Sequence, residues 1–389
     1  MEALVNPSQI RWARERAQLG LDELARDIKV SADKVVDWEE GRVRPSFAQA
    51  QKLAKATRIP FGFLFLDNPP QENLPLPDFR RMGTKRQNKI SPDLRDVLND
   101  VLYKQQWYRD YLVQKGAESL PFIGRFKGGS ATSQFAASEI GKELGITETL
   151  RRSASNWEDY FGKLIKQAEA ARIWVLRNSV VGNNNTRKLS EEEFRGFAIA
   201  DDIAPLIFIN TSDSKTAQIF TFAHELAHLW VGASGISNQS LESHSGDDEA
   251  IERYCNEIAA ELLAPTKEFL SVWNQAVPDD ERLARTARYF RLSTVVIARR
   301  AFDLKIFEWN EYVTTYRREK EKWVKSQRTD GQADFFNTLK SRNGNRFTRA
   351  VLLSAFEGQS LMRDAASLLG VKPNSLHAAY KKLLSGAKG

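Results

Sequence analysis

The chain has 389 residues and a formal net charge of +7 at pH 7, and 42% of its residues are hydrophobic while 28% are charged. This length suffices for two or three domains with their own cores, but no apolar run is long enough to span a membrane and the N-terminus lacks the apolar segment of a signal peptide. A single cysteine excludes an internal disulfide bond, which favours a cytoplasmic protein, and the basic charge is compatible with nucleic-acid binding.

Residues 9–66 have the apolar spacing of five short helices, and Ser31 is the predicted N-cap of the third. Residues 24–31 read L-A-x-x-I-x-V-S and residues 38–45 read W-E-x-G-x-x-x-P, a pattern that resembles the XRE-type helix-turn-helix family. The resemblance implies DNA binding by the third helix in the major groove. The predicted contact residues are Ser31, Ala32, Lys34 and Val35.

The charge of this segment leaves the role of its helices open. Residues 1–66 carry 11 basic and 9 acidic side chains, and four of the acidic ones fall within residues 32–40. DNA-binding domains usually present a more basic face, and Gly20 stands where the family usually has Ser or Thr as a helix cap. The alternative is a helical bundle that mediates dimerisation or the docking of a partner protein.

Residues 67–90 are predicted to be a linker, because two proline-rich stretches prevent regular helices. The basic side chains of this linker suit either a solvated segment or an arm that touches phosphates: Arg80, Arg81, Lys85, Arg86 and Lys89. A long helix then runs from Ser91 to about Gln114. Its aromatic side chains are expected in a core or at a seam between domains: Tyr103, Trp107, Tyr108 and Tyr111.

The middle of the chain is predicted to contain helices, then strands, then a further helix. The predicted helices are residues 132–144, residues 155–171 and a helix that begins near Ser214. The predicted strands are residues 173–176, 194–199 and 205–210, with a loop at residues 183–185. A small sheet is therefore expected just before the helix at Ser214.

The helix after Ser214 contains the motif His-Glu-x-x-His, formed by His224, Glu225 and His228. Residues four apart lie on one face of a helix, so the two imidazoles are placed to bind one zinc ion. The Glu225 carboxylate then lies beside the open position of the metal, where it can accept a proton from bound water. The motif predicts a catalytic zinc site if a third ligand is present.

Glu252 is the predicted third ligand, in a second helix that begins near residue 247 and ends before Pro265. Asn256 follows one turn later, where its amide is placed to orient a ligand histidine. Glu261 is expected to be solvated. The predicted buried stripe of this helix is Ile251, Cys255, Ile258, Ala259, Leu262 and Leu263.

The motif HELAH followed by E-x-x-C-N-x-x-A-A-x-L-L-x-P resembles the ImmA/IrrE family of zinc metallopeptidases, roughly over residues 190–310. The resemblance implies a zincin fold with a gluzincin-like site and a zinc-activated water molecule. It also implies that an edge strand before the catalytic helix, within residues 197–210, holds the substrate in extended form. The implied substrates are DNA-binding repressors.

Zinc-dependent hydrolysis also needs a group that stabilises the oxyanion. His244 and Tyr254 are candidates by position, although His244 lies in a polar loop that favours simple exposure. Cys255 is expected to be a small buried thiol, with a redox role as the alternative. His377 is expected to be structural.

The C-terminal part contains two further copies of the helix-turn-helix pattern. Residues 287–293 have an alanine, two apolar residues and a capping serine at the same relative positions as residues 25–31. Residues 366–373 form a looser copy of this pattern. The alternative is that both copies are structural helix corners. Between them, residues 316–349 contain ten basic and four acidic side chains, which suits nucleic acid, an acidic partner or a solvated helix. Its interleaved aromatic residues are Trp323, Phe335, Phe336 and Phe347.

Together these patterns predict a mostly helical α+β protein with a small sheet. The predicted domains are an N-terminal XRE-type five-helix bundle at residues 1–68, a linker with a long helix at 69–130, a zincin-like metallopeptidase domain at 131–272, and a helical C-terminal region with helix-turn-helix-like units at 273–389.

Two classes of function fit this organisation. The first is a DNA-binding regulator with a zinc-dependent endopeptidase domain that cleaves a partner repressor or regulatory protein at one site. The second is an antitoxin-like or transcriptional regulatory protein, acting in a stress response, that binds DNA and a toxin with little or no proteolysis. Proteins similar in length and domain order often have the gene of a small toxin, such as a PIN-type ribonuclease, as their neighbour. The oligomeric state is open.

Overall fold

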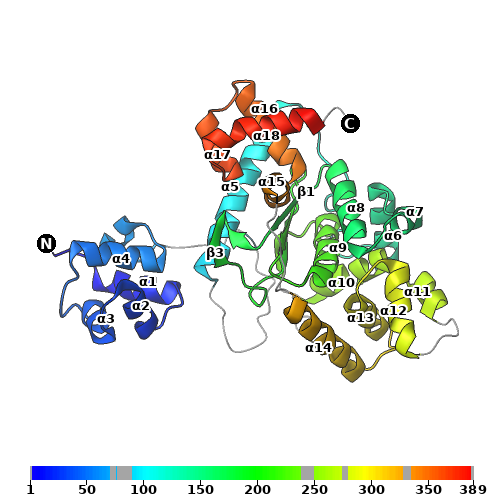
Figure 1. Cartoon of the computed structure of the whole chain (residues 1–389), viewed down its shortest axis with the longest axis horizontal. Coiled ribbons are helices and arrows are strands. Elements are labelled where there is room, and N and C mark those ends of the chain that lie inside the picture. The colour runs from blue at the N-terminus through cyan, green and yellow to red at the C-terminus, as the bar shows by residue number, and fades with distance from the viewer. Residues whose placement is uncertain are drawn as a thin grey trace. The chain divides into compact units, whose positions relative to one another are not determined.

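The computed structural model describes residues 2–70, 76, 90–237, 249–273, 279–326 and 334–386. These residues are mostly helical with a small mixed sheet, so the predicted fold class is confirmed (Figure 1). The chain forms two compact units, one of Met1–Pro75 with Thr84–Asp100 and the other of Leu76–Gly83 with Val101–Gly389. Among the helices described, none combines the length and the apolarity that crossing a bilayer requires.

The first unit contains the predicted N-terminal helices around a core that includes the fully buried Ile10, Trp38 and Leu53. Gly20 is the N-cap of the second helix, and its N–H donates to Glu23 Oε2 at 2.8 Å. The helices are α1 (Pro7–Arg16), α2 (Leu21–Ile28), α3 (Ala32–Glu39) and α4 (Phe47–Thr57), and the predicted fifth is a 3-10 helix, η1 (Phe61–Phe65). The long helix α5 (Pro92–Gln114) follows the linker, which lies mostly outside the described residues.

A four-stranded sheet in the second unit lies beside the helices that carry the predicted zinc ligands. Its strand order is β1-β5-β4-β6, in which β1 and β5 are parallel and the other pairs are antiparallel. The strands are β1 (Trp174–Asn178), β4 (Gly196–Ile199), β5 (Leu206–Asn210) and β6 (Gly235–Ser237). Asn184 and Asn185, predicted to lie in a loop, instead belong to a hairpin of β2 (Val180–Val181) and β3 (Asn184–Lys188).

The prediction that residues 197–210 contain a substrate-binding edge strand is wrong. Both strands of this region, β4 and β5, pair with a neighbour on each side. Among the described residues, the edges of the sheet are β1 and β6, because β6 pairs with the outer side of β4. A peptide that adds to this sheet must therefore pair with β1 or β6.

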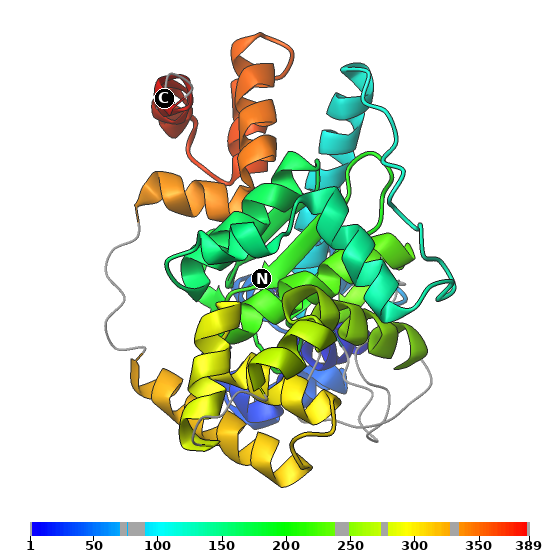
Figure 2. The ribbon, with the colours of Figure 1, turned by 90° about the vertical axis from the view of Figure 1, so that its right-hand side faces the viewer.

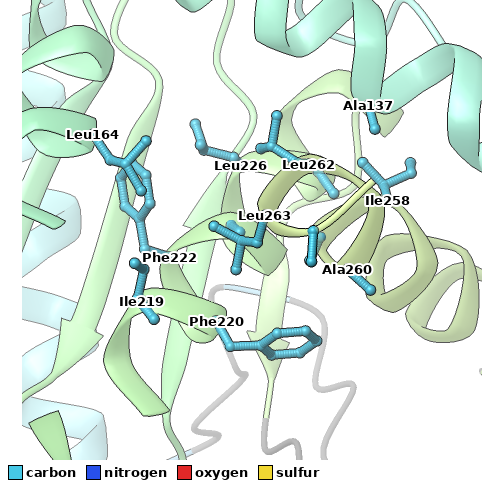
Figure 3. Packing of buried hydrophobic residues seen from close by; sticks show 14 of the residues in the cluster. Ala137, Leu164, Ile219, Phe220, Phe222, Leu226, Ile258, Ala260, Leu262 and Leu263 are labelled. Atoms are coloured by element: carbon cyan, nitrogen blue, oxygen red, sulfur yellow. The ribbon is translucent and has the colours of Figure 1, made fainter. Parts of the chain in front are cut away.

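The predicted catalytic helix packs tightly on the predicted ligand helix. Figure 3 shows Leu226 of α9 beside Leu262 and Leu263 of α10, while Ile258 of α10 points toward Ala137 of α6. These side chains belong to one core, which fixes α9 and α10 relative to the sheet. The helices of this region are α6 (Ser133–Leu144), α7 (Glu148–Arg152), α8 (Trp157–Ala170), α9 (Lys215–Val231) and α10 (Glu249–Leu263).

Eight further helices follow Pro265 in the part of the chain that the structure describes. Within the second unit, α11–α14 and α15–α18 lie at opposite ends, with the sheet and α9 between them (Figure 1, Figure 2). They are α11 (Thr266–Trp273), α12 (Asp279–Phe290), α13 (Thr294–Asp303), α14 (Trp309–Ser326), α15 (Phe335–Asn343), α16 (Asn345–Phe356), α17 (Met362–Leu369) and α18 (Pro373–Gly386).

Three predicted environments differ from those in the structure. Glu261, expected to be solvated, is buried, and its Oε1 accepts a hydrogen bond from Arg300 Nη2 at 2.5 Å. Ile251, expected in the buried stripe of α10, is 39% exposed. Phe347 does not interleave with a basic surface, because it is fully buried and stacks on Trp174 at 4.4 Å between ring centroids.

The aromatic stripe of α5 is buried only in part. Tyr108 is buried in edge-on contact with Trp174 and Phe347, at centroid distances of 5.4 and 5.6 Å. Tyr103, on the same helix, is 62% exposed, so of the two predicted environments the core is excluded for this residue.

Candidate metal centre

Helix α9 is fixed at both ends by contacts that its sequence provides. Ser214 caps the N-terminus, where its hydroxyl accepts a hydrogen bond from the Ala217 N–H at 3.3 Å. Gly232 ends the helix in the left-handed conformation, with φ of 73°. The Gly124 and Phe126 N–H groups donate to the last carbonyls of the helix at 2.9 and 2.8 Å, which satisfies acceptors that the helix itself leaves unpaired.

The structure brings the three predicted ligands together. His224 Nε2 and His228 Nε2 are 2.8 Å apart, and Glu252 places Oε2 3.3 Å from His224 Nε2 and Oε1 3.0 Å from His228 Nε2. Four ligands about 2.1 Å from a zinc ion in a tetrahedron lie about 3.4 Å from one another. These ligand atoms of the three residues therefore have nearly the spacing that one such ion imposes.

The donor set also fits a catalytic metal. Two imidazole nitrogens and one carboxylate leave a fourth coordination position, as in zinc hydrolases. Both histidines are buried and Glu252 is partly buried. Burial alone would raise the pKa of the Glu252 carboxyl, but the imidazoles of His224 and His228 hold that pKa well below its ordinary value. The carboxyl is therefore in the ionised form that a metal ligand requires.

Glu225 is fully buried beside the backbone of β4. A Cβ atom at Gly196 would lie 2.9 Å from Glu225 Oε1 and 2.9 Å from the Phe208 carbonyl oxygen, so any side chain at residue 196 would collide with both. Glycine is required here by this close approach. No role for Gly196 was predicted from the sequence, although a lone glycine inside an apolar strand is the signal of such an approach.

Two further residues of α10, Asn256 and Cys255, interact with the two histidines. The Asn256 side chain hydrogen bonds with His224, in the position expected for a residue that orients a metal ligand. Cys255 is buried and interacts with His228. Burial raises the pKa of the Cys255 thiol, which keeps this side chain neutral.

Of the predicted oxyanion stabilisers, Tyr254 does not join this cluster. The Tyr254 hydroxyl donates to the Ala131 carbonyl at 2.7 Å, so it is engaged on the side of α10 that faces α6. His244 lies outside the described residues. His377 is exposed on α18, with its ring edge-on to Phe356 at 5.0 Å.

The predicted DNA contacts on α3 fall in different environments. Ser31 is exposed, while Ala32 and Lys34 are partly exposed. Val35 is fully buried in the core of the first unit, so its assignment as a DNA contact is wrong. The apolar spacing of α3 accounts for this, because Val35 and Trp38 are three residues apart and both face inward.

Comparisons with known families agree with both resemblances. Residues 168–302 match the family model Peptidase M78, the IrrE N-terminal-like domain, and residues 8–60 match a helix-turn-helix domain. Residues 343–382 match a domain of unknown function, DUF8813. A search of curated proteins found no match. The chain thus carries a helix-turn-helix domain and an IrrE N-terminal-like peptidase domain.

Proposed function

We propose that this protein is a cytoplasmic DNA-binding regulator whose central domain is a zinc-dependent endopeptidase that cleaves a partner regulatory protein at a specific site. The observation that carries the proposal is the convergence of His224, His228 and Glu252, with Glu225 on the same helix as both histidines. The family matches support a regulator with a peptidase domain.

Each residue of the centre has a distinct role in the proposed reaction. His224, His228 and Glu252 hold the metal, and Asn256 fixes the orientation of His224. Zinc, when bound there, supplies a Lewis acid that activates water and polarises the scissile carbonyl. Glu225 accepts the proton of the attacking water and passes it to the amine of the leaving peptide.

The substrate is expected to approach along β6. Gly196 faces Glu225 and pairs with Ser237 of β6, so β6 is the strand next to the site on the side away from β5. An edge strand offers unpaired backbone groups to an extended peptide. A partner protein with an exposed, extended segment fits this arrangement better than a compact domain does.

The decisive experiment compares the parent protein with Glu225→Gln. Each is purified with zinc and incubated with the proteins encoded by the neighbouring genes, and new N-termini are identified by mass spectrometry. Parent protein should produce one defined cleavage. Glu225→Gln should produce none while it retains the same zinc content, because its amide cannot accept the proton.

The same variant separates the two classes of function. Equal cleavage by Glu225→Gln would refute the role given to Glu225. If the parent protein cleaves nothing and Glu225→Gln still neutralises a toxin in co-expression, the antitoxin-like alternative replaces proteolysis. That alternative assigns partner binding to the helical units that flank the peptidase domain.

A further inference from the structure

The C-terminal helices α16, α17 and α18 pack against one another as a three-helix unit. The turn between α17 and α18 has the same backbone form as the turn between α2 and α3. Gly370 has φ of 64° and the Val371 N–H donates to the Ala366 carbonyl at 2.9 Å, while Lys29 has φ of 61° and the Val30 N–H donates to the Ala25 carbonyl at 2.9 Å. The looser third copy of the sequence pattern therefore has the same turn as the N-terminal copy, between two helices that pack against each other.

The third copy of the pattern, at residues 366–373, differs from the second copy, at residues 287–293, in how far its second helix is exposed to solvent. The turn between α12 and α13 has the same form, with φ of 54° at Arg291, but α13 is buried in the main core. Its buried side chains include Val296, Ile297, Ala298 and Ala301. The second copy is consequently a structural helix corner, whereas α18 has one side on its own unit and the other in solvent.

The solvent side of α18 has the spacing of a recognition helix. Asn374, His377, Ala378 and Lys381 are exposed on one side of the helix, because residues 377 and 378 each lie three or four residues from both 374 and 381. Leu376 and Ala379 face inward. In helix-turn-helix proteins, residues near the N-terminus of the second helix contact base edges. Asn374 is the second residue of α18 and has the amide group that pairs with adenine.

The charge of this region favours nucleic acid more clearly than that of α3 does. Residues 371–389 contain four lysines and no acidic residue, whereas residues 32–40 contain four acidic residues and one lysine. Lys372 and Lys381 are exposed at the turn and on the outer side of α18. Contacts with phosphates supply most of the affinity for DNA. The basic region around α18 is therefore better suited to bind DNA than the acidic α3 is.

The β2–β3 hairpin lies beside the α17–α18 turn. The Asn183 side chain donates to the Gly370 carbonyl, and Arg342 holds the same side chain through a 2.6 Å hydrogen bond from Nη1 to Asn183 Oδ1. The hairpin exposes Asn184, Thr186 and Lys188. The turn of the hairpin, at Asn183, thus lies at the α17–α18 turn, and Lys188 lies at the other end of the hairpin, opposite Val180.

We propose that α18 and the β2–β3 hairpin form a second surface that binds duplex DNA. Helix α18 enters the major groove with Asn374 and His377 toward the base edges, and Lys372 and Lys381 contact phosphates on either side. The hairpin contacts the adjacent backbone through Lys188. This surface gives a role to the region that matches a domain of unknown function, and it acts independently of the proposed proteolysis.

The test uses the full chain and a labelled 30-base-pair duplex of mixed sequence, titrated at two salt concentrations. The double variant Lys372→Gln/Lys381→Gln should bind about tenfold more weakly at the lower salt, and the slope of log affinity against log salt should fall by about 2, since each phosphate contact contributes about 0.9. Lys267→Gln, at an exposed lysine of α11, is the matched control and should change neither quantity.

Two further variants complete the test. Asn374→Ala should change the sequences recovered by selection from random duplexes while leaving the salt slope intact, because it removes a base contact and no charge. Glu225→Gln should bind DNA like the parent protein, which separates this proposal from proteolysis. Binding by Lys372→Gln/Lys381→Gln that equals that of the parent, with an unchanged melting temperature, overturns the proposal and leaves α18 as a surface for protein partners. Unchanged selection by Asn374→Ala overturns its base-reading part.

Discussion

Gly196 on β4 touches the carboxylate of Glu225 on α9, so closely that a Cβ atom at residue 196 would lie 2.9 Å from Glu225 Oε1. The position of the proposed general base is thus set by a strand outside its own helix. A Cβ atom at residue 196 would also lie 2.9 Å from the Phe208 carbonyl oxygen and 2.9 Å from Thr221 Cγ2. Strand β4, strand β5 and helix α9 therefore meet at this glycine.

Gly196→Ala should reduce proteolysis without releasing the metal. The added methyl group displaces the Glu225 carboxylate, and misplacement of a reacting group by about an ångström can cost about a hundredfold in rate. The three heavy atoms nearest to this methyl group belong to Glu225, Phe208 and Thr221, and none of them belongs to a histidine or to Glu252. Cleavage rate and zinc content, measured on the same preparation, check the prediction.

Gly162→Ala is the matched control for this substitution. Gly162 lies in α8, and a Cβ atom there would meet no heavy atom within 4 Å. This change should leave activity unchanged and stabilise the helix by about 0.5–1 kcal/mol. If Gly196→Ala loses zinc along with activity, the glycine supports the whole site and not Glu225 in particular.

Cys255→Ala should weaken zinc binding by about 10–100-fold, the usual effect of removing a group that orients a metal ligand. The buried Cys255 side chain interacts with His228, and alanine removes that interaction. Competition with a chromophoric chelator measures the affinity. Ile258→Val is the control, since it removes one buried methyl group from the same helix at a cost of about 1 kcal/mol in stability. Equal zinc affinity in Cys255→Ala and Ile258→Val would show that the thiol only fills space.

The convergence of His224, His228 and Glu252 was predictable from the sequence because its determinants are local. His224, Glu225 and His228 lie on one helix, and helical spacing alone puts both imidazoles on one face. Glu252 was identified by its place at the border of an apolar stripe, and the packing of α10 on α9 brings it to the histidines. The turns at Lys29, Arg291 and Gly370 were likewise encoded by short patterns.

Contacts between distant segments were not predicted in the same way. Strand β6 has three residues, too few for a periodic pattern, and it exists because it pairs with β4. Val35 reads as a surface residue of a recognition helix but fills the core of the first unit. The sequence indicates that such residues are apolar or charged, while their burial depends on partners far away in the chain.

Gly232→Ala should destabilise the second unit. Gly232 ends α9 at φ of 73°, and a Cβ atom there would lie 2.8 Å from Gly124 Cα, in the segment that caps the last turn of α9. Strain from the positive φ costs about 1 kcal/mol, and the backbone collision adds to it. Gly116→Ala provides the comparison, because it has φ of 76° with open space around its Cβ position. Chemical denaturation should show a larger loss for Gly232→Ala, and equal losses would mean that Gly124 moves freely.

A buried ion pair at the end of α10 joins this helix to α13. Arg300 Nη2 donates to Glu261 Oε1 at 2.5 Å, and Arg300 Nε donates to the Ala264 carbonyl at 3.0 Å. The Thr266 hydroxyl and N–H also donate to the Glu261 carboxylate. Burial alone would raise the pKa of Glu261, but the hydrogen bonds from Thr266 and the charge of Arg300 lower it below its ordinary value near 4.5.

This lowered pKa predicts acid-dependent stability. The folded protein binds the Glu261 proton less readily than the unfolded chain does, so the stabilisation is complete above pH 4.5 and is lost as the pH falls below that value. Glu261→Gln should lose about 3 kcal/mol near neutral pH, because Arg300 is left as a buried unpaired charge, and its deficit relative to the parent should shrink in acid. Glu257→Gln, at an exposed residue one turn earlier, should follow the parent at every pH. Urea denaturation from pH 3 to pH 7 measures the three curves. A constant deficit for Glu261→Gln across this range would contradict the assignment of the lowered pKa to Glu261.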